Sequence, residues 1–253
     1  MIRVIGDDNG RAILQSEMWR CIVSAIEFTL GHMRLYYLTG AQFGLSNLAL
    51  RRVKVSRFAD LNDPFELLAV DLQDRQHREA LRKLKEALSA TKGLICLSHS
   101  WENPLLWGHY AEKHTGMALG FEVTDHIPAE VIYAKTPEVI PIDKTTNTPT
   151  LSEELMNRLL RTKFQDWKYE DEMRIFVELD HETRESGLYF YEFSSDFQLR
   201  EVILGPKCEL PLESVRVLVS GIKPSVTVLK SRIAFSSFRV VQNKTLNEPN
   251  EKV

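Results

Sequence analysis

The 253-residue chain has few cysteines, no large charge excess and no common nucleotide- or metal-binding motif. Its three cysteines, Cys21, Cys96 and Cys208, are far apart and form neither a Cys-x-x-Cys zinc pattern nor a disulfide framework, which indicates a reducing, cytoplasmic environment. With 32 lysines and arginines against 35 aspartates and glutamates, the formal charge of −3 predicts no overall attraction to nucleic acid or to an anionic membrane.

Several sequence signatures are absent as well. There is no Gly-x-Gly-x-x-Gly, no phosphate loop ending in Gly-Lys-Ser/Thr and no Gly-x-Ser-x-Gly, which argues against Rossmann, kinase-like and α/β-hydrolase enzymes. No His-Glu-x-x-His is present, and His109 and His114 are five residues apart with His99 on another element, so we expect no metal site. The apolar fraction of 43% and the charged fraction of 26% are those of an ordinary globular protein.

The two ends of the chain differ from its middle. Residues 12–30 carry apolar side chains at helical spacing, but interspersed charges argue against a membrane span, and Asp7 and Asp8 argue against a signal peptide. We therefore expect an amphipathic helix or an extension over residues 1–32, a domain over 33–241 and a loose tail over 242–253.

Short strands and helices mingle between these ends without a regular βαβ rhythm. The pattern predicts strands at 33–38, 52–56, 94–99, 117–123, 131–133, 172–179, 188–193, 201–204 and 226–229, and helices at 41–50, 73–90, 103–113, 152–164 and 213–219. This predicts a single α+β domain in which several helices flank a mixed, mostly antiparallel sheet, whole or split.

Four groups of residues are richer in polar and aromatic side chains than a plain core requires. They are Tyr36-Tyr37, the loop Asn62–Glu66, the stretch Ser98–His114, and Trp167–Arg174. Adjacent tyrosines on a strand point to opposite faces, so at most one can line a given pocket. Three of the groups also have a structural interpretation: cross-strand packing of the tyrosines, a proline-fixed turn, and a same-face ion pair between Glu172 and Arg174. The dense His, Trp and Tyr side chains of Ser98–His114 are suited to a site that stacks a planar ring.

Taken together, four motifs resemble the bacterial domain of unknown function 2971 family. The motifs are Leu35-Tyr36-Tyr37, Leu61–Glu66, Leu106–Tyr110 with Gly116 and Gly120-Phe121, and Trp167-x-Tyr169-Glu170-x-Glu172-x-Arg174. The resemblance runs from about Met33 to the region 201–205. It implies a domain but no established reaction.

The chain is also similar to ADP-ribosyltransferase-like domains. In these, a first strand bears Arg, His or Tyr, a middle strand bears Ser-x-Ser or Tyr, and a late strand bears Glu, often as Glu-x-Glu. Here Arg34 or Tyr36, Ser98-x-Ser100 and Glu170-x-Glu172 follow in that order. The similarity implies NAD as co-substrate, with a carboxylate stabilising the charge that develops as the N-glycosidic bond breaks.

This similarity assigns roles to residues as expectations. Glu172 or Glu170 is the expected catalytic carboxylate, and Arg174 orients it. The residues expected to bind the nucleotide are Arg34, Tyr36, Tyr37, Asn62, Ser98, Trp107, His109 and Tyr110. The expected partners are a small-molecule nucleotide and a protein or nucleic-acid target, and no membrane.

Three functions remain open from the sequence. The first is an NAD-using ADP-ribosyltransferase-like enzyme in bacterial stress response or phage defence. The second is a non-catalytic ligand-sensing or protein-interaction module that uses the same pocket. The third, a metal-dependent nuclease built on Asp63, Glu66, Glu170 and Glu172, ranks last because no basic stripe accompanies these acids.

Overall fold

The computed structural model describes residues 5–6, 12–13, 31–63, 65–66, 75–137, 142–143, 148–149, 152–180 and 184–247. Of the helix expected over residues 12–30, only Ala12–Ile13 is described, and it forms a strand, β2, paired with β1 (Ile5–Gly6). The expected helix therefore does not begin at Ala12, and its remainder lies outside the described residues. The tail begins with a short helix, α6 (Lys244–Asn247), and residues 248–253 lie outside the described part.

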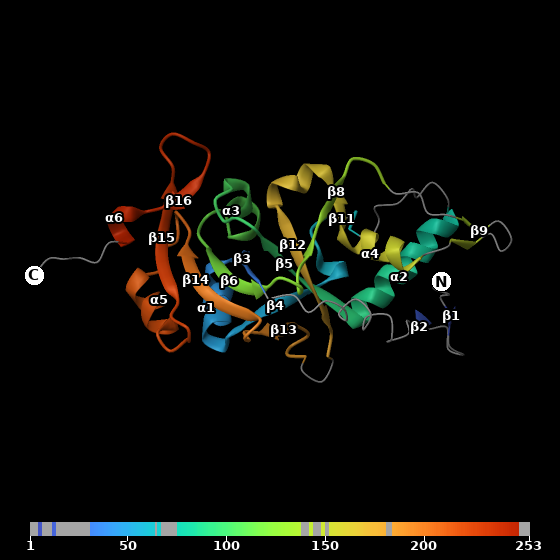
Figure 1. The fold of residues 1–253 in the computed structure, drawn as a ribbon, viewed down its shortest axis with the longest axis horizontal. Coiled ribbons are helices and arrows are strands. Elements are labelled where there is room, and N and C mark those ends of the chain that lie inside the picture. Colours follow the sequence, from blue (N-terminus) through green and yellow to red (C-terminus); the bar gives the residue numbers. More distant parts are fainter. Residues whose placement is uncertain are drawn as a thin grey trace, which may run out of the picture.

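Helices lie against several parts of a large sheet (Figure 1). They are α1 (Ala41–Leu50), α2 (Arg75–Thr91), α3 (Pro104–Tyr110), α4 (Glu153–Arg161) and α5 (Leu212–Val219), with short 3-10 helices η2 (Phe58–Asp60) and η3 (Gln165–Glu170). None of the helices in the described part is long and apolar enough to cross a membrane.

Among the described residues, ten strands form one sheet in the order β13-β4-β5-β3-β6-β14-β15-β16, with β12 paired to β5 and to β7. The strands are β3 (His32–Thr39), β4 (Arg52–Arg57), β5 (Lys92–Ser98), β6 (Met117–Thr124), β7 (Ala129–Glu130), β12 (Glu172–Glu178), β13 (Tyr189–Glu192), β14 (Phe197–Leu204), β15 (Thr227–Ile233) and β16 (Val240–Gln242). Within this sheet only β14 and β15, which α5 connects, run parallel. Small separate pairs are β8 (Ile132–Ala134) with β11 (Thr162–Phe164), and β9 (Ile142–Asp143) with β10 (Thr148–Pro149). The architecture confirms the expected single α+β domain with a mixed, mostly antiparallel sheet.

The sheet divides between β3 and β5. Strand β5 pairs with β12 along its whole length, from Lys92 to Ser98. On its other edge β5 meets β3 at one pair, Tyr36–Ser98, and meets β4 only near its opposite end, at Leu94 and Gly93. Strands β3 and β4 therefore diverge along β5, and the two halves of the sheet are joined at the Tyr36–Ser98 pair.

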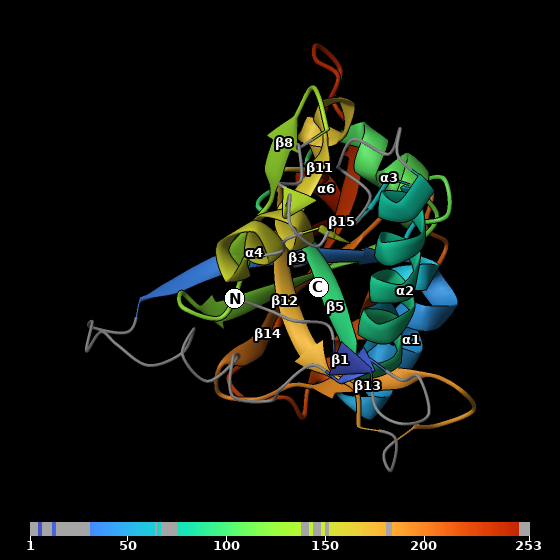
Figure 2. The same ribbon diagram turned by 90° about the vertical axis from the view of Figure 1, so that its right-hand side faces the viewer.

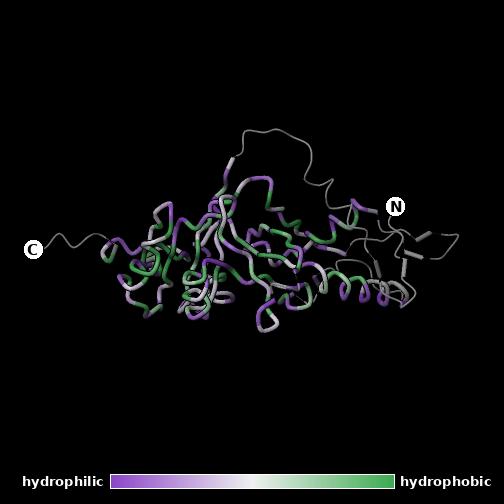
Figure 3. The backbone as a smooth tube through the Cα atoms, turned by 90° about the horizontal axis from the view of Figure 1, so that it is seen from below, coloured by the Kyte–Doolittle hydropathy of each residue, from purple (hydrophilic) through white to green (hydrophobic). Residues whose placement is uncertain are grey.

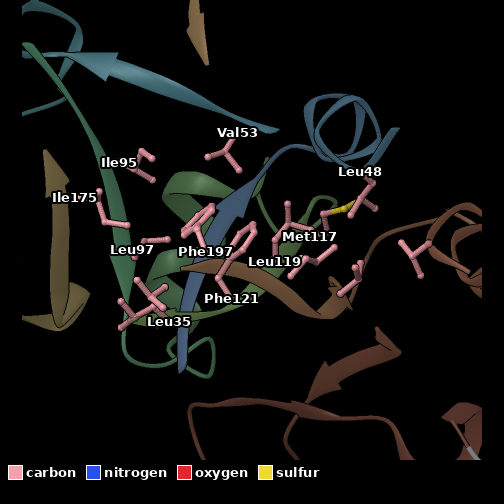
Figure 4. Packing of buried hydrophobic residues seen from close by; sticks show 14 of the residues in the cluster. Leu35, Leu48, Val53, Ile95, Leu97, Met117, Leu119, Phe121, Ile175 and Phe197 are labelled. Atoms are coloured by element: carbon pink, nitrogen blue, oxygen red, sulfur yellow. The ribbon is translucent and has the colours of Figure 1, made fainter. Parts of the chain in front are cut away.

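One face of the sheet carries the main hydrophobic core. Leu35, Phe121 and Leu97 project from neighbouring strands on this face, and the rings of Phe121 and Phe197 stack with centroids 3.9 Å apart (Figure 4). In the hydropathy tube, hydrophobic stretches are seen in the middle of the molecule (Figure 3). Since side chains alternate along a strand, the residues between these positions face the opposite side.

The opposite face is divided between two smaller apolar clusters. One gathers Phe58, residues of α2 and α4, and Leu94 of β5, so both helices cover the same face of β5 and β12 (Figure 2). The other contains Trp107 of α3, Ala118 of β6 and Ile203 of β14. The polar residues of β3, β5 and β12 belong to this divided face, because their neighbours in sequence belong to the main core.

Two predicted helices end earlier than the sequence pattern indicates. Helix α4 is capped by Ser152, whose Oγ accepts from the Leu155 amide at 3.1 Å, but it ends at Arg161 and the chain continues as strand β11. Helix α3 ends at Tyr110 rather than at 113, because residues 112–114 have positive φ angles of 47°, 54° and 78°. Left-handed backbone cannot continue a right-handed helix.

Candidate functional site

The expected catalytic residues lie together at the start of β12, and all three are buried. Asp171, with φ 46°, forms a tight turn between η3 and β12, and this turn brings Glu170 and Glu172 to the same interior position. Arg174 follows two residues later on the same face, and its Nε donates to Glu172 Oε1 at 2.9 Å. The expected same-face ion pair is therefore present, but in the interior rather than in solvent.

Two residues absent from the expected site complete this buried cluster. Glu66 accepts two hydrogen bonds from the Arg174 guanidinium, at 2.9 and 2.6 Å. Lys163 Nζ contacts Glu170, donates to Glu172 Oε2 at 3.0 Å, and lies 3.7 Å from Glu66. We call Glu66, Lys163, Glu170, Glu172 and Arg174 the buried charge cluster.

In this cluster, burial and neighbouring opposite charges shift the pKa of each group in opposite directions. Burial alone raises the pKa of the Glu172 carboxyl, but Arg174 and Lys163 outweigh it and lower this pKa to about 2. For Glu170 burial wins over Lys163, so the pKa of its carboxyl lies above its ordinary value. Burial lowers the pKa of Lys163, but the neighbouring carboxylates raise it by more, so the net change is a rise. Glu172 is thus held ionised while Glu170 accepts a proton more readily.

A hydrogen-bonded chain connects this cluster to the surface. Asn62 Nδ2 donates to the Tyr110 hydroxyl at 2.8 Å, and that hydroxyl donates to Glu170. The His109 ring lies beside Tyr110, Trp167 and Tyr169, with centroid distances of 6.1, 6.0 and 6.0 Å. Of the residues expected to bind nucleotide, Tyr110 therefore contacts the expected catalytic carboxylate Glu170, while Asn62 and His109 lie beside Tyr110.

Ser98 occupies the junction between the two half-sheets. It pairs in register with Tyr36 of β3 on one side and with Glu172 of β12 on the other. In an antiparallel sheet such directly opposed residues share a face. The three residues that the enzyme interpretation drew from first, middle and late strands thus lie in one row.

A cavity of about 630 Å³ opens beside this row. Its lining includes Ser98 and Ser100 after β5, Asn103 at the start of α3, and Tyr169 and Asp171 of the turn before β12. Asn103 holds two of these walls together, because its Oδ1 accepts from the Leu105 amide at 3.0 Å and its Nδ2 donates to the Tyr169 carbonyl at 3.1 Å. The volume is within the range of small-molecule sites.

The side chains of Tyr36 and Arg34, on β3, are directed toward Glu201 of β14. Tyr36 points away from β5: its ring passes over Gly120, where a Cβ would come within 2.9 Å of it, and its hydroxyl donates to Glu201 at 3.0 Å. Arg34 also pairs with Glu201, at 2.8 Å. Burial, and then Glu201, raise the pKa of Tyr36 to about 12.

Two aromatic residues of the expected site have packing roles. Tyr37 packs against the main core on the opposite face from Ser98, as the alternation of adjacent tyrosines predicts, and burial raises its pKa to about 12. Trp107 is fully buried, and its Nε1 donates to the Trp101 carbonyl at 2.6 Å.

Sequence reasoning missed Lys163, and it considered Glu66 as part of the Asn62–Glu66 loop and as a nuclease ligand but not as a partner of Arg174. Lys163 lies four residues after Leu159, on the apolar stripe of the helix predicted over 152–164. A lysine on an apolar stripe indicates a buried acidic partner, since a buried ammonium must be paired. This signal was available in the sequence.

The cluster does not resemble a metal centre. Within the described ranges, no group of His, Cys, Asp or Glu side chains is placed to hold a metal ion. The three carboxylates that a divalent ion would bridge instead surround the Lys163 ammonium.

Comparison with known proteins identifies one family. Residues 106–175 match the model of a protein family of unknown function, DUF2971. No curated protein and no solved structure matches the chain, and the similarity to ADP-ribosyltransferase-like domains gains no support from these comparisons. The chain therefore resembles the DUF2971 family over the segment from α3 to β12, which carries every member of the buried charge cluster except Glu66.

Proposed function

We propose that the protein is an NAD-using enzyme that cleaves the N-glycosidic bond between nicotinamide and ribose, by ADP-ribosyl transfer or by hydrolysis. Nicotinamide leaves with the electron pair of its bond to ribose C1′, and a nearby carboxylate stabilises the positive charge that develops there. Water or a target nucleophile then bonds to C1′ and loses a proton. We assign this activity to bacterial stress response or phage defence, in the cytoplasm.

One observation carries the proposal: Tyr36, Ser98 and Glu172 are in register on three neighbouring strands, where the two half-sheets join. The order Tyr, Ser-x-Ser and Glu-x-Glu along the sequence did not require this spatial row, because the residues are separated by 62 and 74 positions. The adjacent cavity offers room for a nucleotide.

The surrounding residues have roles consistent with this chemistry. Ser100 offers a hydroxyl group for ribose, and Tyr169 offers a ring for planar packing, since both line the cavity. Ser98 holds Ser100 in place, because its Oγ donates to the Ser100 carbonyl at 2.9 Å and accepts from the Ser100 amide at 3.2 Å. Arg174 and Lys163 keep Glu172 ionised, as an electrostatic role requires. Two other carboxylates line the cavity directly: Glu102, which is paired with Arg239, and Asp171, which precedes Glu172.

The test is NAD cleavage by the purified full chain, measured as nicotinamide release, with and without cell lysate as a source of targets. We expect Glu172→Gln to lower turnover about 100-fold, the lower range for loss of an electrostatic stabiliser. The matched control is Glu178→Gln, at the other end of the same strand on the same face but 79% exposed at its side chain. Its turnover should equal that of the wild type.

The variant Asp171→Asn distinguishes between Asp171 and Glu172 as the catalytic carboxylate. If it abolishes cleavage while folded Glu172→Gln retains it, Asp171 is the catalytic carboxylate and Glu172 a positioning residue. Thermal unfolding of each variant shows whether it is folded. Absence of nicotinamide release and of any labelled product, in both conditions, contradicts the enzyme proposal.

A second function, a binding module without turnover, is favoured by a different observation. Both Glu172 oxygens accept hydrogen bonds from Arg174, and the side chain is only 3% exposed. In that case NAD raises the melting temperature by mass action and is recovered intact.

A further inference from the structure

A continuous basic segment lies near the C-terminal end of the chain. Between residues 214 and 247 there are six lysines and arginines and no aspartate or glutamate, although the whole chain carries a net charge of −3. The segment covers most of α5, the hairpin of β15 and β16, and α6. These elements lie together at one end of the molecule (Figure 1).

The loop between β15 and β16 carries two exposed aromatic rings. Phe235 is 93% exposed and Phe238 is 97% exposed, the highest values among the large hydrophobic residues that the structure describes. The loop is tight, because the Ala234 amide donates to the Arg239 carbonyl at 2.9 Å. Solvent exposure of two rings on one loop forfeits about 1.5–3 kcal/mol of burial energy for each, which indicates a recognition surface.

This loop is fixed to the rim of the cavity. The Val240 amide donates to the Glu102 carbonyl at 2.8 Å, and Arg239 forms an ion pair with the Glu102 side chain. Phe238 and Arg239 both line the cavity. The exposed rings are thus held in a defined position next to the proposed NAD site.

We propose that the β15–β16 loop binds single-stranded nucleic acid, with Phe235 and Phe238 stacking on bases and the surrounding cations contacting phosphates. Exposed aromatic rings combined with positive charge are the usual means of holding an unpaired strand without reading its sequence. The Arg232 guanidinium lies 4.3 Å from the centre of the Phe235 ring. The ring can therefore stack a base on its other face while Arg232 remains beside the phosphates.

The same features fit a membrane surface less well. Insertion into a bilayer would require Arg232 to leave the Phe235 ring or to enter the apolar region with it, and charged side chains are costly there. Ser236 and Ser237, between the two rings, would also have to lose hydration. A nucleic-acid strand demands neither change.

The test is fluorescence anisotropy of labelled oligothymidine and oligouridine, each about 20 nucleotides long, titrated with the full chain at about 50 mM salt without NAD. We expect both strands to bind, and the double variant Phe235→Ala/Phe238→Ala to weaken binding at least about tenfold. The matched control is Phe43→Ala, a ring 62% exposed on α1, which should leave binding unchanged. Because this assay contains no NAD, its result is independent of the proposed NAD cleavage.

Three results overturn the proposal: the wild type binds neither strand, the double variant binds as tightly as the wild type, or the wild type binds only vesicles of phosphatidylserine and phosphatidylcholine. The last result assigns the loop to a membrane surface instead. A difference between the two oligonucleotides distinguishes DNA from RNA as the natural ligand. Circular dichroism of the double variant checks that the fold is retained, and two fully exposed side chains give no reason for its loss.

Discussion

At the residue scale, Lys163 is a buried cation with three acidic neighbours. Its ammonium contacts Glu170 and Glu172 and lies 3.7 Å from Glu66, and its side chain is 4% exposed. Removing one partner of a buried ion pair costs about 3–5 kcal/mol, because the remaining charge is left without compensation. We therefore expect Lys163→Met to lower the free energy of unfolding by about this amount, measured by urea denaturation at neutral pH.

Lys83→Met is the control for this change. Lys83 forms an exposed pair with Glu79 on α2 at 3.5 Å, so its loss should cost about 0.3–0.5 kcal/mol. Adding Glu170→Gln to Lys163→Met should restore part of the lost stability, since it removes one uncompensated carboxylate. Equal effects of the two lysine substitutions would show that the buried charge cluster contributes no more than a surface pair.

At the scale of elements, Asn103 joins helix α3 to η3 across the cavity. Its side chain caps α3 through the Leu105 amide and also holds the Tyr169 carbonyl at 3.1 Å. We expect Asn103→Ala to cost about 1 kcal/mol in stability, as for other N-caps, and to reduce the NAD-induced rise in melting temperature.

Helix α4 offers a matched comparison. Ser152 caps it through the Leu155 amide, and α4 contributes no residue to the lining of the cavity. Ser152→Ala should therefore lower stability by about the same amount and leave the NAD-induced shift unchanged. If both variants respond to NAD alike, the link between α3 and η3 does not position the ligand.

Elements also determine how much of the site the sequence could predict. The strict alternation from Glu172 to Glu178 predicts β12 and places Glu172 and Arg174 on one face, because a strand repeats every two residues. The sequence does not predict that Glu66, 108 residues before Arg174, reaches its guanidinium, since loop positions carry no periodic signal. Nor does it predict burial of Glu170, which reads as part of a solvated acidic turn.

Helix boundaries show the same limit. The apolar spacing from Leu155 to Leu160 predicts α4, and the pattern continues through Lys163. The chain nevertheless leaves the helix after Arg161 and pairs as β11 with β8. The sequence pattern does not predict this pairing, because it is a tertiary contact between distant segments. Local propensity is a weak guide where such contacts are available.

At the scale of the whole molecule, charge is distributed unevenly. The basic segment 214–247 lies at the opposite end of the molecule from α2 (Figure 1), and the rest of the chain must be acidic overall, since the total is −3. An acidic body and a basic end favour one orientation for an approaching polyanion. The affinity for a single-stranded nucleic acid should therefore fall with salt concentration, with a slope set by the number of cations near the β15–β16 loop.

Arg232 and Lys244 are the cations on or next to the β15–β16 hairpin that we expect to contact phosphates, since Arg239 is already paired with Glu102. Each phosphate contact contributes about −0.7 to the slope of log affinity against log salt for a single strand, so two contacts predict a slope of about −1.4. Arg232→Gln should reduce the magnitude of this slope by about 0.7, while Arg82→Gln on α2, 61% exposed at its side chain, should not change it. The slope is measured by oligonucleotide titration at several salt concentrations. A slope near zero for the wild type would mean that the rings bind without help from the basic segment. An equal change of slope in Arg232→Gln and Arg82→Gln would mean that net charge alone, rather than its position, controls binding.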